Sequence, residues 1–329
     1  MKRIGANLLL CISLIGCFAK RETSGTLKTG IWRATVEIQG QQLPFILECR
    51  KDDSDGYDFY LRNANERLML DEVTVRGDSV DIVLHIFDAN LKARIIGDTL
   101  RGEFIKNFAK DYRLPFQAVY GQHHRFEKGN DQQNITEYAG KYSVEFVHEK
   151  DTTKAIAIFQ QSGDSVTGTF LTPTGDYRYL EGNVANGQLN LSTFDGNYAY
   201  LFRATKDPDG RLRGEYYSGK TWYETWVAVK DENASLPDAD ALTYLKEGYD
   251  KIAFSFPDVE GKMVSLTDQK YQNKVVIIQL LGTWCPNCMD ETLFLKDWYN
   301  NNKDRGVEII GLAYERKADF AYASERVRK

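Results

Sequence analysis

The stretch that decides the fold reads Val275-Val276-Ile277-Ile278-Gln279-Leu280-Leu281-Gly282-Thr283-Trp284-Cys285-Pro286-Asn287-Cys288. Its first seven residues form an apolar run rich in β-branched side chains, which is typical of a fully buried strand in a parallel sheet. The segment from Met289 to Asn302 predicts a helix with one buried stripe, since large apolar residues recur among polar ones. That stripe consists of Leu293, Leu295, Trp298 and Tyr299. The two cysteines therefore lie where a strand turns into a helix.

This position predicts the chemistry of the cysteine pair. Pro286 suits the first helical turn, because proline lacks an N–H that would have no partner there. The remaining free N–H groups and the positive end of the helix dipole favour a thiolate at Cys285 over a thiol. We therefore expect Cys285 to be the exposed sulfur of lower pKa, which attacks a substrate disulfide. Cys288, three residues further on, is placed to resolve the mixed disulfide.

The block resembles the thioredoxin superfamily, whose redox motif has the same C-x-x-C spacing. It resembles more closely the membrane-anchored, periplasm-facing thiol-disulfide oxidoreductases of the TlpA/ResA type. That resemblance is carried by FSFPDVEGK at 254–262, VSL at 264–266 and GTWC at 282–285. The buried acid of cytoplasmic thioredoxins would fall at Gln279, so the chain departs from them at this position.

The resemblance implies roles for the residues around the cysteines. An acidic residue three positions after the second cysteine tunes the site in that family, and here it is Glu291, a possible proton-transfer partner. Trp284, Pro286 and Asn287 are expected to shape the redox potential. The implied substrates are disulfide-containing envelope proteins, which the chain would reduce with electrons from a membrane or periplasmic donor. No cofactor or metal is implied.

The cysteine pair could instead have a purely structural role. A structural zinc site needs four ligands, but no second C-x-x-C follows, and the histidines lie far upstream. They are His85, His123, His124 and His148. An inert structural disulfide is a further alternative, although the strand before the motif does not require one. Glu291 could simply complement the helix dipole, since it lies near the predicted helix start.

The composition is that of a soluble globular protein. The 329 residues are 42% hydrophobic and 27% charged with net charge −5, enough for two or three domains and without the basic excess that nucleic-acid binding requires.

The N-terminus, residues 1–17, predicts a lipoprotein signal peptide. A basic start at Lys2 and Arg3 precedes an apolar run over 4–15, which is too short to span a membrane. Leu14-Ile15-Gly16-Cys17 resembles a bacterial lipobox, so Cys17 would be lipidated and begin the mature protein, with 18–27 as a tether. A plain secretory signal is the alternative. We expect a location in the cell envelope, lipid-anchored and facing the periplasm.

The next 200 residues or so predict all-β structure. Short alternating segments between turn signals indicate a barrel or sandwich. Three landmarks recur 110, 107 and 112 residues later, which indicates a duplicated domain over 28–122 and 137–230. They are GIWR at 30–33, FDAN at 87–90 and LRGEF at 100–104. His123 to Gln133 would link the copies, with His123, His124 and Arg125 in a solvated loop.

The role of the β domains is open between two interpretations. Their aromatic residues could line a ligand cavity, as in small antiparallel barrels. Alternatively, they fill ordinary cores, and the domains act as spacers or docking surfaces. The aromatic residues in question are Trp32, Tyr142, Trp222 and Trp226. Cys49 is expected to point into a sheet core and be inert. The rival function is an envelope lipoprotein whose β domains bind a ligand or partner, with a vestigial redox segment.

The C-terminal part predicts an acidic linker over 231–252, with a short helix from Leu242 to Tyr249, and a thioredoxin-like domain over 253–329. That domain should contain a hairpin over 253–266, a second strand over 307–314 and a helix from Lys317. No proline follows Pro286, so the cis-proline half of a thioredoxin fold is missing, and we expect this domain to be incomplete.

Overall fold

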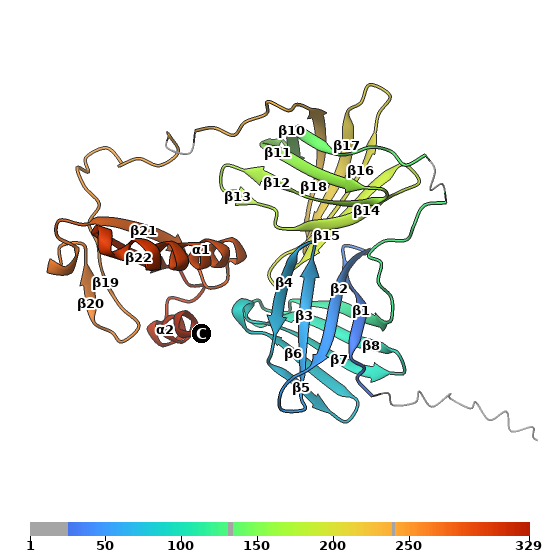
Figure 1. Ribbon diagram of the computed structural model, residues 1–329, viewed down its shortest axis with the longest axis horizontal. Helices are drawn as coiled ribbons and strands as arrows, with labels where there is room; N and C mark the ends of the chain where they lie inside the picture. Colours follow the sequence, from blue (N-terminus) through green and yellow to red (C-terminus); the bar gives the residue numbers. More distant parts are fainter. Residues whose placement is uncertain (1–25, 131–133, 239–240) are drawn as a thin grey trace, which may run out of the picture.

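The structure is a computed structural model that describes residues 26–130, 134–238 and 241–329. The predicted signal peptide, Cys17 and most of the tether lie outside the described residues. The described chain forms two nine-stranded antiparallel sheets and a smaller α/β part (Figure 1). We call them the first β domain (β1–β9), the second β domain (β10–β18) and the redox segment (residues 253–329).

The first β domain is a curled sheet with the strand order β4-β3-β2-β1-β9-β8-β7-β6-β5. Its strands alternate inward and outward side chains, as in β1, where Trp32, Ala34 and Val36 are fully buried. β3 and β5 are in contact without being hydrogen-bonded, so the sheet nearly closes on itself. The strands are β1 Gly30–Ile38, β2 Gln41–Lys51, β3 Tyr57–Asn63, β4 Glu66–Leu70, β5 Val73–Arg76, β6 Ser79–Leu84, β7 Ala89–Ile96, β8 Thr99–Lys106 and β9 Arg113–Tyr120, with the 3-10 helix η1 His85–Phe87 between β6 and β7.

The second β domain has the corresponding strand order and is closed, because β12 pairs with both β11 and β14. Gly30 and Gly140 open the matching strands β1 and β10 with φ values of 123° and 131°, a region that favours glycine. Two sheets with one strand order are what an internal repeat produces. The strands are β10 Gly140–His148, β11 Asp151–Ser162, β12 Ser165–Thr172, β13 Gly175–Asp176, β14 Leu180–Ala185, β15 Gln188–Phe194, β16 Ala199–Lys206, β17 Leu212–Ser218 and β18 Trp222–Lys230.

Aromatic side chains fill the interior of the second β domain. Phe170 and Phe202 stack with ring centroids 4.7 Å apart, and Trp226 packs edge-on against Phe170. This packing favours the core interpretation over a ligand cavity. The expectation that Trp222 fills a core is wrong, because this side chain is 46% exposed and stacks on His148 at the surface.

The two β domains share buried contacts. Phe194, the last residue of β15, enters the core of the first domain, and its ring centroid lies 4.2 Å from that of Phe45 in a stacked arrangement. Arg125 does not lie in a solvated loop as predicted. Its side chain is 3% exposed and bonds Asn63 and Ser192, because the segment after β9 runs between the two sheets. The contact between the two β domains is therefore a packed interface.

The redox segment contains a parallel pair of strands, β21 and β22, with helix α1 between them in sequence, as predicted. The prediction that the first strand is fully buried is wrong. Val275 and Leu280 are 66% and 63% exposed, because β21 has β22 as its single partner in the described chain. Leu293 of the predicted stripe is also exposed, at 55%. The elements are β19 Ser255–Pro257, β20 Met263–Ser265, η3 Gln269–Tyr271, β21 Val275–Leu281, α1 Pro286–Asn302, η4 Lys303–Arg305, β22 Val307–Ala313 and α2 Phe320–Arg328.

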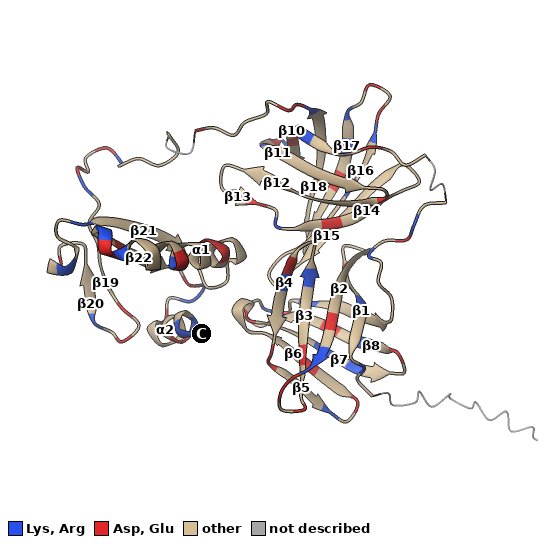
Figure 2. Cartoon of the chain, in the orientation of Figure 1, with Lys and Arg blue, Asp and Glu red and all other residues tan. Residues whose placement is uncertain are grey.

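The linker before the redox segment does not contain the predicted helix over 242–249. Tyr244 and Tyr249 are 81% and 68% exposed, so a helix there would lack the packed face that stabilises short helices. Among the described residues, no helix has the length and apolar character needed to span a membrane. Acidic and basic residues are interspersed over all three parts of the chain (Figure 2).

Candidate active site

The two cysteines occupy the start of α1. Cys285 is the N-cap, and Pro286 is the first helical residue, as its position in the sequence predicts. The backbone N–H of Cys288 donates to Sγ of Cys285 at 3.2 Å, which satisfies one of the free donors of the first turn. Cys285 and Cys288 are both free thiols. One helical turn therefore presents both thiols of the motif.

The pKa of Cys285 differs from the expectation. Burial, followed by the neighbouring Cys288 thiol, raises the pKa of Cys285 to about 11. The hydrogen bond from the Cys288 N–H favours the thiolate, but it does not outweigh the loss of solvation. The predicted low pKa is therefore wrong for this arrangement, because sequence reasoning placed the sulfur in solvent.

Gln279 and Glu291 meet beneath the first turn of α1. Gln279 is 6% exposed, and its Nε2 donates to Glu291 Oε2 at 3.1 Å and to the Cys288 carbonyl at 3.3 Å. The Glu291 carboxylate thus contacts the residue that replaces the thioredoxin acid. Its predicted part in proton transfer remains a prediction.

The residues before the motif bond to the end of β22. Glu315 accepts from the N–H and the hydroxyl of Thr283, both at 2.9 Å, and the Trp284 indole N–H donates to the Tyr314 carbonyl at 2.9 Å. The Arg316 guanidinium lies 5.0 Å from the centroid of the Trp284 ring. Sequence reasoning missed Glu315 and Arg316. Their position directly after a strand parallel to β21 was the available signal, since the carboxyl ends of parallel strands meet at one edge.

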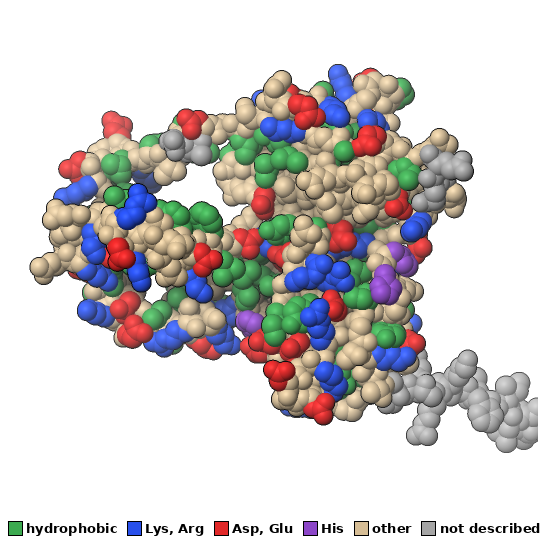
Figure 3. Space-filling view, in the orientation of Figure 1, with side chains coloured by type: hydrophobic (Ala, Val, Ile, Leu, Met, Phe, Trp, Pro, Cys, Tyr) green, Lys and Arg blue, Asp and Glu red, His purple; other side chains and the backbone are tan. Residues whose placement is uncertain are grey.

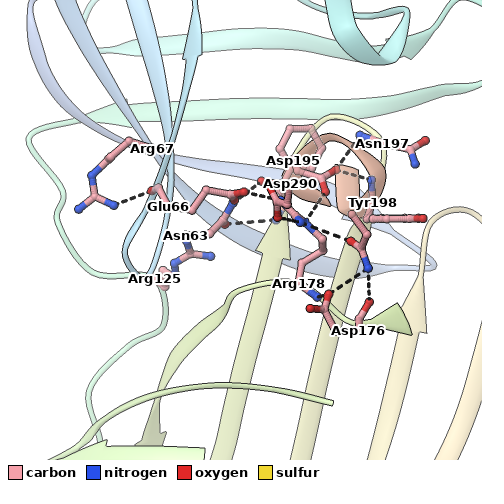
Figure 4. A network of polar contacts seen from close by, with 12 residues as sticks. Asn63, Glu66, Arg67, Arg125, Asp176, Arg178, Asp195, Asn197, Tyr198 and Asp290 are labelled. Atoms are coloured by element: carbon pink, nitrogen blue, oxygen red, sulfur yellow. Dashed lines mark hydrogen bonds and ion pairs between the residues drawn. The ribbon is translucent and has the colours of Figure 1, made fainter. Parts of the chain in front are cut away.

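Asn287 and Asp290 bond to the second β domain, and Figure 4 shows Asp290 beside Arg178. The Asn287 Nδ2 donates to Asp176 Oδ1 at 3.1 Å, and Arg178 Nη1 donates to Asn287 Oδ1 at 3.3 Å. The same guanidinium nitrogen bonds Asp290 Oδ2 at 2.5 Å. Arg178 also pairs with Glu66 and Asp195. No sequence signal predicts these contacts, because Arg178 lies more than 100 residues from α1.

Cys49 is the one further cysteine within the part of the chain that the structure describes. Cys49 is 1% exposed, which confirms the prediction that it points into a sheet core. Burial raises its pKa to about 12, which disfavours the reactive thiolate, and its inertness stays a prediction. Within 26–130, 134–238 and 241–329, no group of three or more His, Cys, Asp or Glu residues is arranged to hold a metal ion.

Comparison with known proteins places the resemblance in the redox segment. Residues 248–326 match the AhpC/TSA family. The thiol-disulfide oxidoreductase ResA of Bacillus thuringiensis subsp. konkukian is 39% identical over 59 residues, which cover 18% of this chain and 33% of that protein. ResA of Bacillus subtilis is 35% identical over 68 residues, which cover 21% of this chain and 37% of that protein.

The chain thus spans about a third of the length of the curated relatives it matches. The solved structure of a protein of unknown function from the DUF3598 family of Nostoc punctiforme aligns over 61% of this chain and 94% of the Nostoc chain. The sequence identity is 8% and the TM-score is 0.21, which is too low to indicate a shared fold or function. The C-terminal segment is thioredoxin-like, and its relatives are thiol-disulfide oxidoreductases.

Proposed function

We propose that the chain is a thiol-disulfide oxidoreductase of the cell envelope that reduces protein disulfides through Cys285 and Cys288. The observation that carries the proposal is the free dithiol on the first turn of α1, directly after a strand of a parallel pair. The similarity of this segment to ResA supports the same chemistry.

The reaction conserves atoms and electrons. The Cys285 thiolate attacks one sulfur of the substrate disulfide, which forms a mixed disulfide and expels the other substrate sulfur as a thiolate. The Cys288 thiolate then attacks Cys285 Sγ and releases the second substrate sulfur. The substrate gains two electrons and two protons, and the chain keeps a Cys285–Cys288 disulfide. An envelope dithiol donor must reduce this disulfide before the next cycle.

The surrounding residues have supporting roles in the proposal. Glu291, which accepts a hydrogen bond from Gln279 beneath the first turn of α1, is the proton-transfer partner in the proposal. Trp284, Pro286 and Asn287 set the geometry of the motif and thereby its redox potential. Cys17 would hold the protein at a membrane through acyl chains.

The activity is tested by following the reduction of insulin disulfides by the full-length reduced chain in a single turnover. We expect Cys285→Ser to abolish reduction and Cys288→Ser to accumulate a mixed disulfide that gel electrophoresis detects. Cys49→Ala is the matched control and should retain the wild-type rate, since Cys49 is buried in the first β domain. Equal rates for wild type and Cys285→Ser would refute the mechanism.

The envelope location needs a separate test. We expect radiolabelled palmitate to enter the chain in bacterial cells and Cys17→Ser to prevent it. Incorporation that persists in Cys17→Ser would contradict lipidation at this residue.

A further inference from the structure

The end of α1 that carries the cysteines lies against the second β domain. Asn287, between the two cysteines, is held from both ends of its amide by Asp176 and Arg178. Burial, and then the charges of Cys285, Asp195 and Cys288, raise the pKa of Tyr198, so this tyrosine of the turn before β16 is within electrostatic reach of both thiols. Side chains of the second β domain therefore lie beside the two half-buried cysteines.

The redox segment touches both β domains at further points. Arg316, which lies over the Trp284 ring, donates to Asn197 Oδ1 at 2.8 Å and stacks on Phe108 at 3.4 Å. Arg326 of α2 donates to the His85 carbonyl at 2.5 Å and to the Ile86 carbonyl. These contacts join the redox segment to the first and the second β domain. In Figure 3 the redox segment abuts the β domains and is also joined to them through the linker, with an opening between this contact and the linker.

Arg178 is the centre of the contact. Its side chain is 2% exposed and faces three carboxylates, one from each part of the molecule. Glu66 comes from the first β domain, Asp195 from the second and Asp290 from α1 (Figure 4). A buried cation needs such partners, because an unpaired buried charge is strongly unfavourable. Asp290 itself is 41% exposed, so it is the partner that can leave into water at least cost.

We propose that the second β domain is a cap on the redox site, held by the Arg178–Asp290 contact, and that the site opens to protein substrates when the redox segment undocks. This proposal rests on the proposed function and adds that docking of the redox segment regulates it. Disulfide exchange requires the substrate disulfide to approach Cys285 in line, and a protein that carries it needs the space that Asp176, Arg178 and Tyr198 now occupy. Burial in the docked form also disfavours the thiolate, so undocking would both expose and activate Cys285.

The cap is tested by labelling Cys285 in the full chain with two reagents of different size, the small N-ethylmaleimide and a large polyethylene-glycol maleimide. All proteins carry Cys288→Ser, which prevents a disulfide, and peptide mass spectrometry reports the label at Cys285. The opened variant is Asp290→Ala with Arg326→Ala, which removes contacts from the redox segment and leaves Arg178 with Glu66 and Asp195. Arg178→Ala is avoided, since it would leave buried carboxylates without a cation.

We expect the large reagent to label the opened variant about tenfold faster than the parent, a change equivalent to about 1.4 kcal/mol in the opening equilibrium. The small reagent should show a smaller difference. Asp297→Ala is the control, an exposed acidic residue of the same helix, and should leave both rates unchanged.

Equal labelling of parent and opened variant would overturn the cap, as would an equal acceleration by Asp297→Ala. Labelling does not depend on disulfide exchange, so its outcome is separate from the activity. Insulin reduction is measured separately on wild type and on Asp290→Ala with Arg326→Ala, both with Cys288 intact. Faster labelling of the opened variant while neither of these two proteins reduces insulin would refute the proposed function and support the cap.

Discussion

Asp195→Asn should stabilise the protein at neutral pH, although it removes a partner of Arg178. Asp195 is 1% exposed, and burial raises its pKa from 3.8 to about 6, in spite of the Arg178 charge and two backbone hydrogen bonds. The ion pair is weak in geometry, with Nε and Oδ2 3.5 Å apart. At 1.36 kcal/mol per pKa unit, the shift corresponds to about 3 kcal/mol.

The sign follows from the raised pKa. Between about pH 4 and pH 6 the folded state binds the Asp195 proton more tightly than the unfolded chain does. The associated stability is fully present below the unfolded pKa and is lost as the pH rises through about 6. Asparagine resembles the protonated acid, and its Oδ1 can still accept the N–H groups of Asn197 and Tyr198.

Urea unfolding followed by tryptophan fluorescence measures the effect. We expect Asp195→Asn to match wild type near pH 4 and to exceed it by up to about 3 kcal/mol at pH 7.5. Asp55→Asn, at a side chain that is 97% exposed, is the control and should show no such divergence. A variant that is less stable than wild type at pH 7.5, or a difference independent of pH, would refute the reasoning that desolvation outweighs the ion pair.

Two further predictions concern the interface between the two β domains and the reactivity of the Cys285 thiol. Phe194→Ala should lower the free energy of unfolding by about 3–5 kcal/mol, because the fully buried ring stacks on Phe45. The control is Tyr244→Ala, at a side chain that is 81% exposed, which should change the free energy of unfolding by less than about 0.5 kcal/mol. Urea denaturation checks both, and a similar loss in the two variants would contradict the packing argument. The alkylation rate of Cys285 by iodoacetamide in the reduced wild type should keep rising with pH toward about 11, because the thiolate is the reactive form. A plateau near neutral pH would contradict the effect of burial.

The sequence alone was sufficient for the features that depend on local patterns. The β-branched run before Gly282 and the proline after Cys285 predicted a strand, a turn and a helix with the cysteines at its start, and the structure has them there. Turn residues at regular spacing predicted the β domains, and the spaced landmarks predicted two related copies. These features follow from periodicity and backbone preference, which neighbouring residues determine.

Burial and charge environment were decided by tertiary structure. Val275 and Leu293 have the apolar character of core residues, yet they are exposed because no described element covers their faces. Arg125 and Arg178 look like surface cations in the sequence, yet both are buried between sheets whose mutual position no local pattern encodes. The pKa of Cys285 rises for the same reason. Solvation depends on what packs over a group, and here the covering residues come from segments more than 80 positions away in the chain.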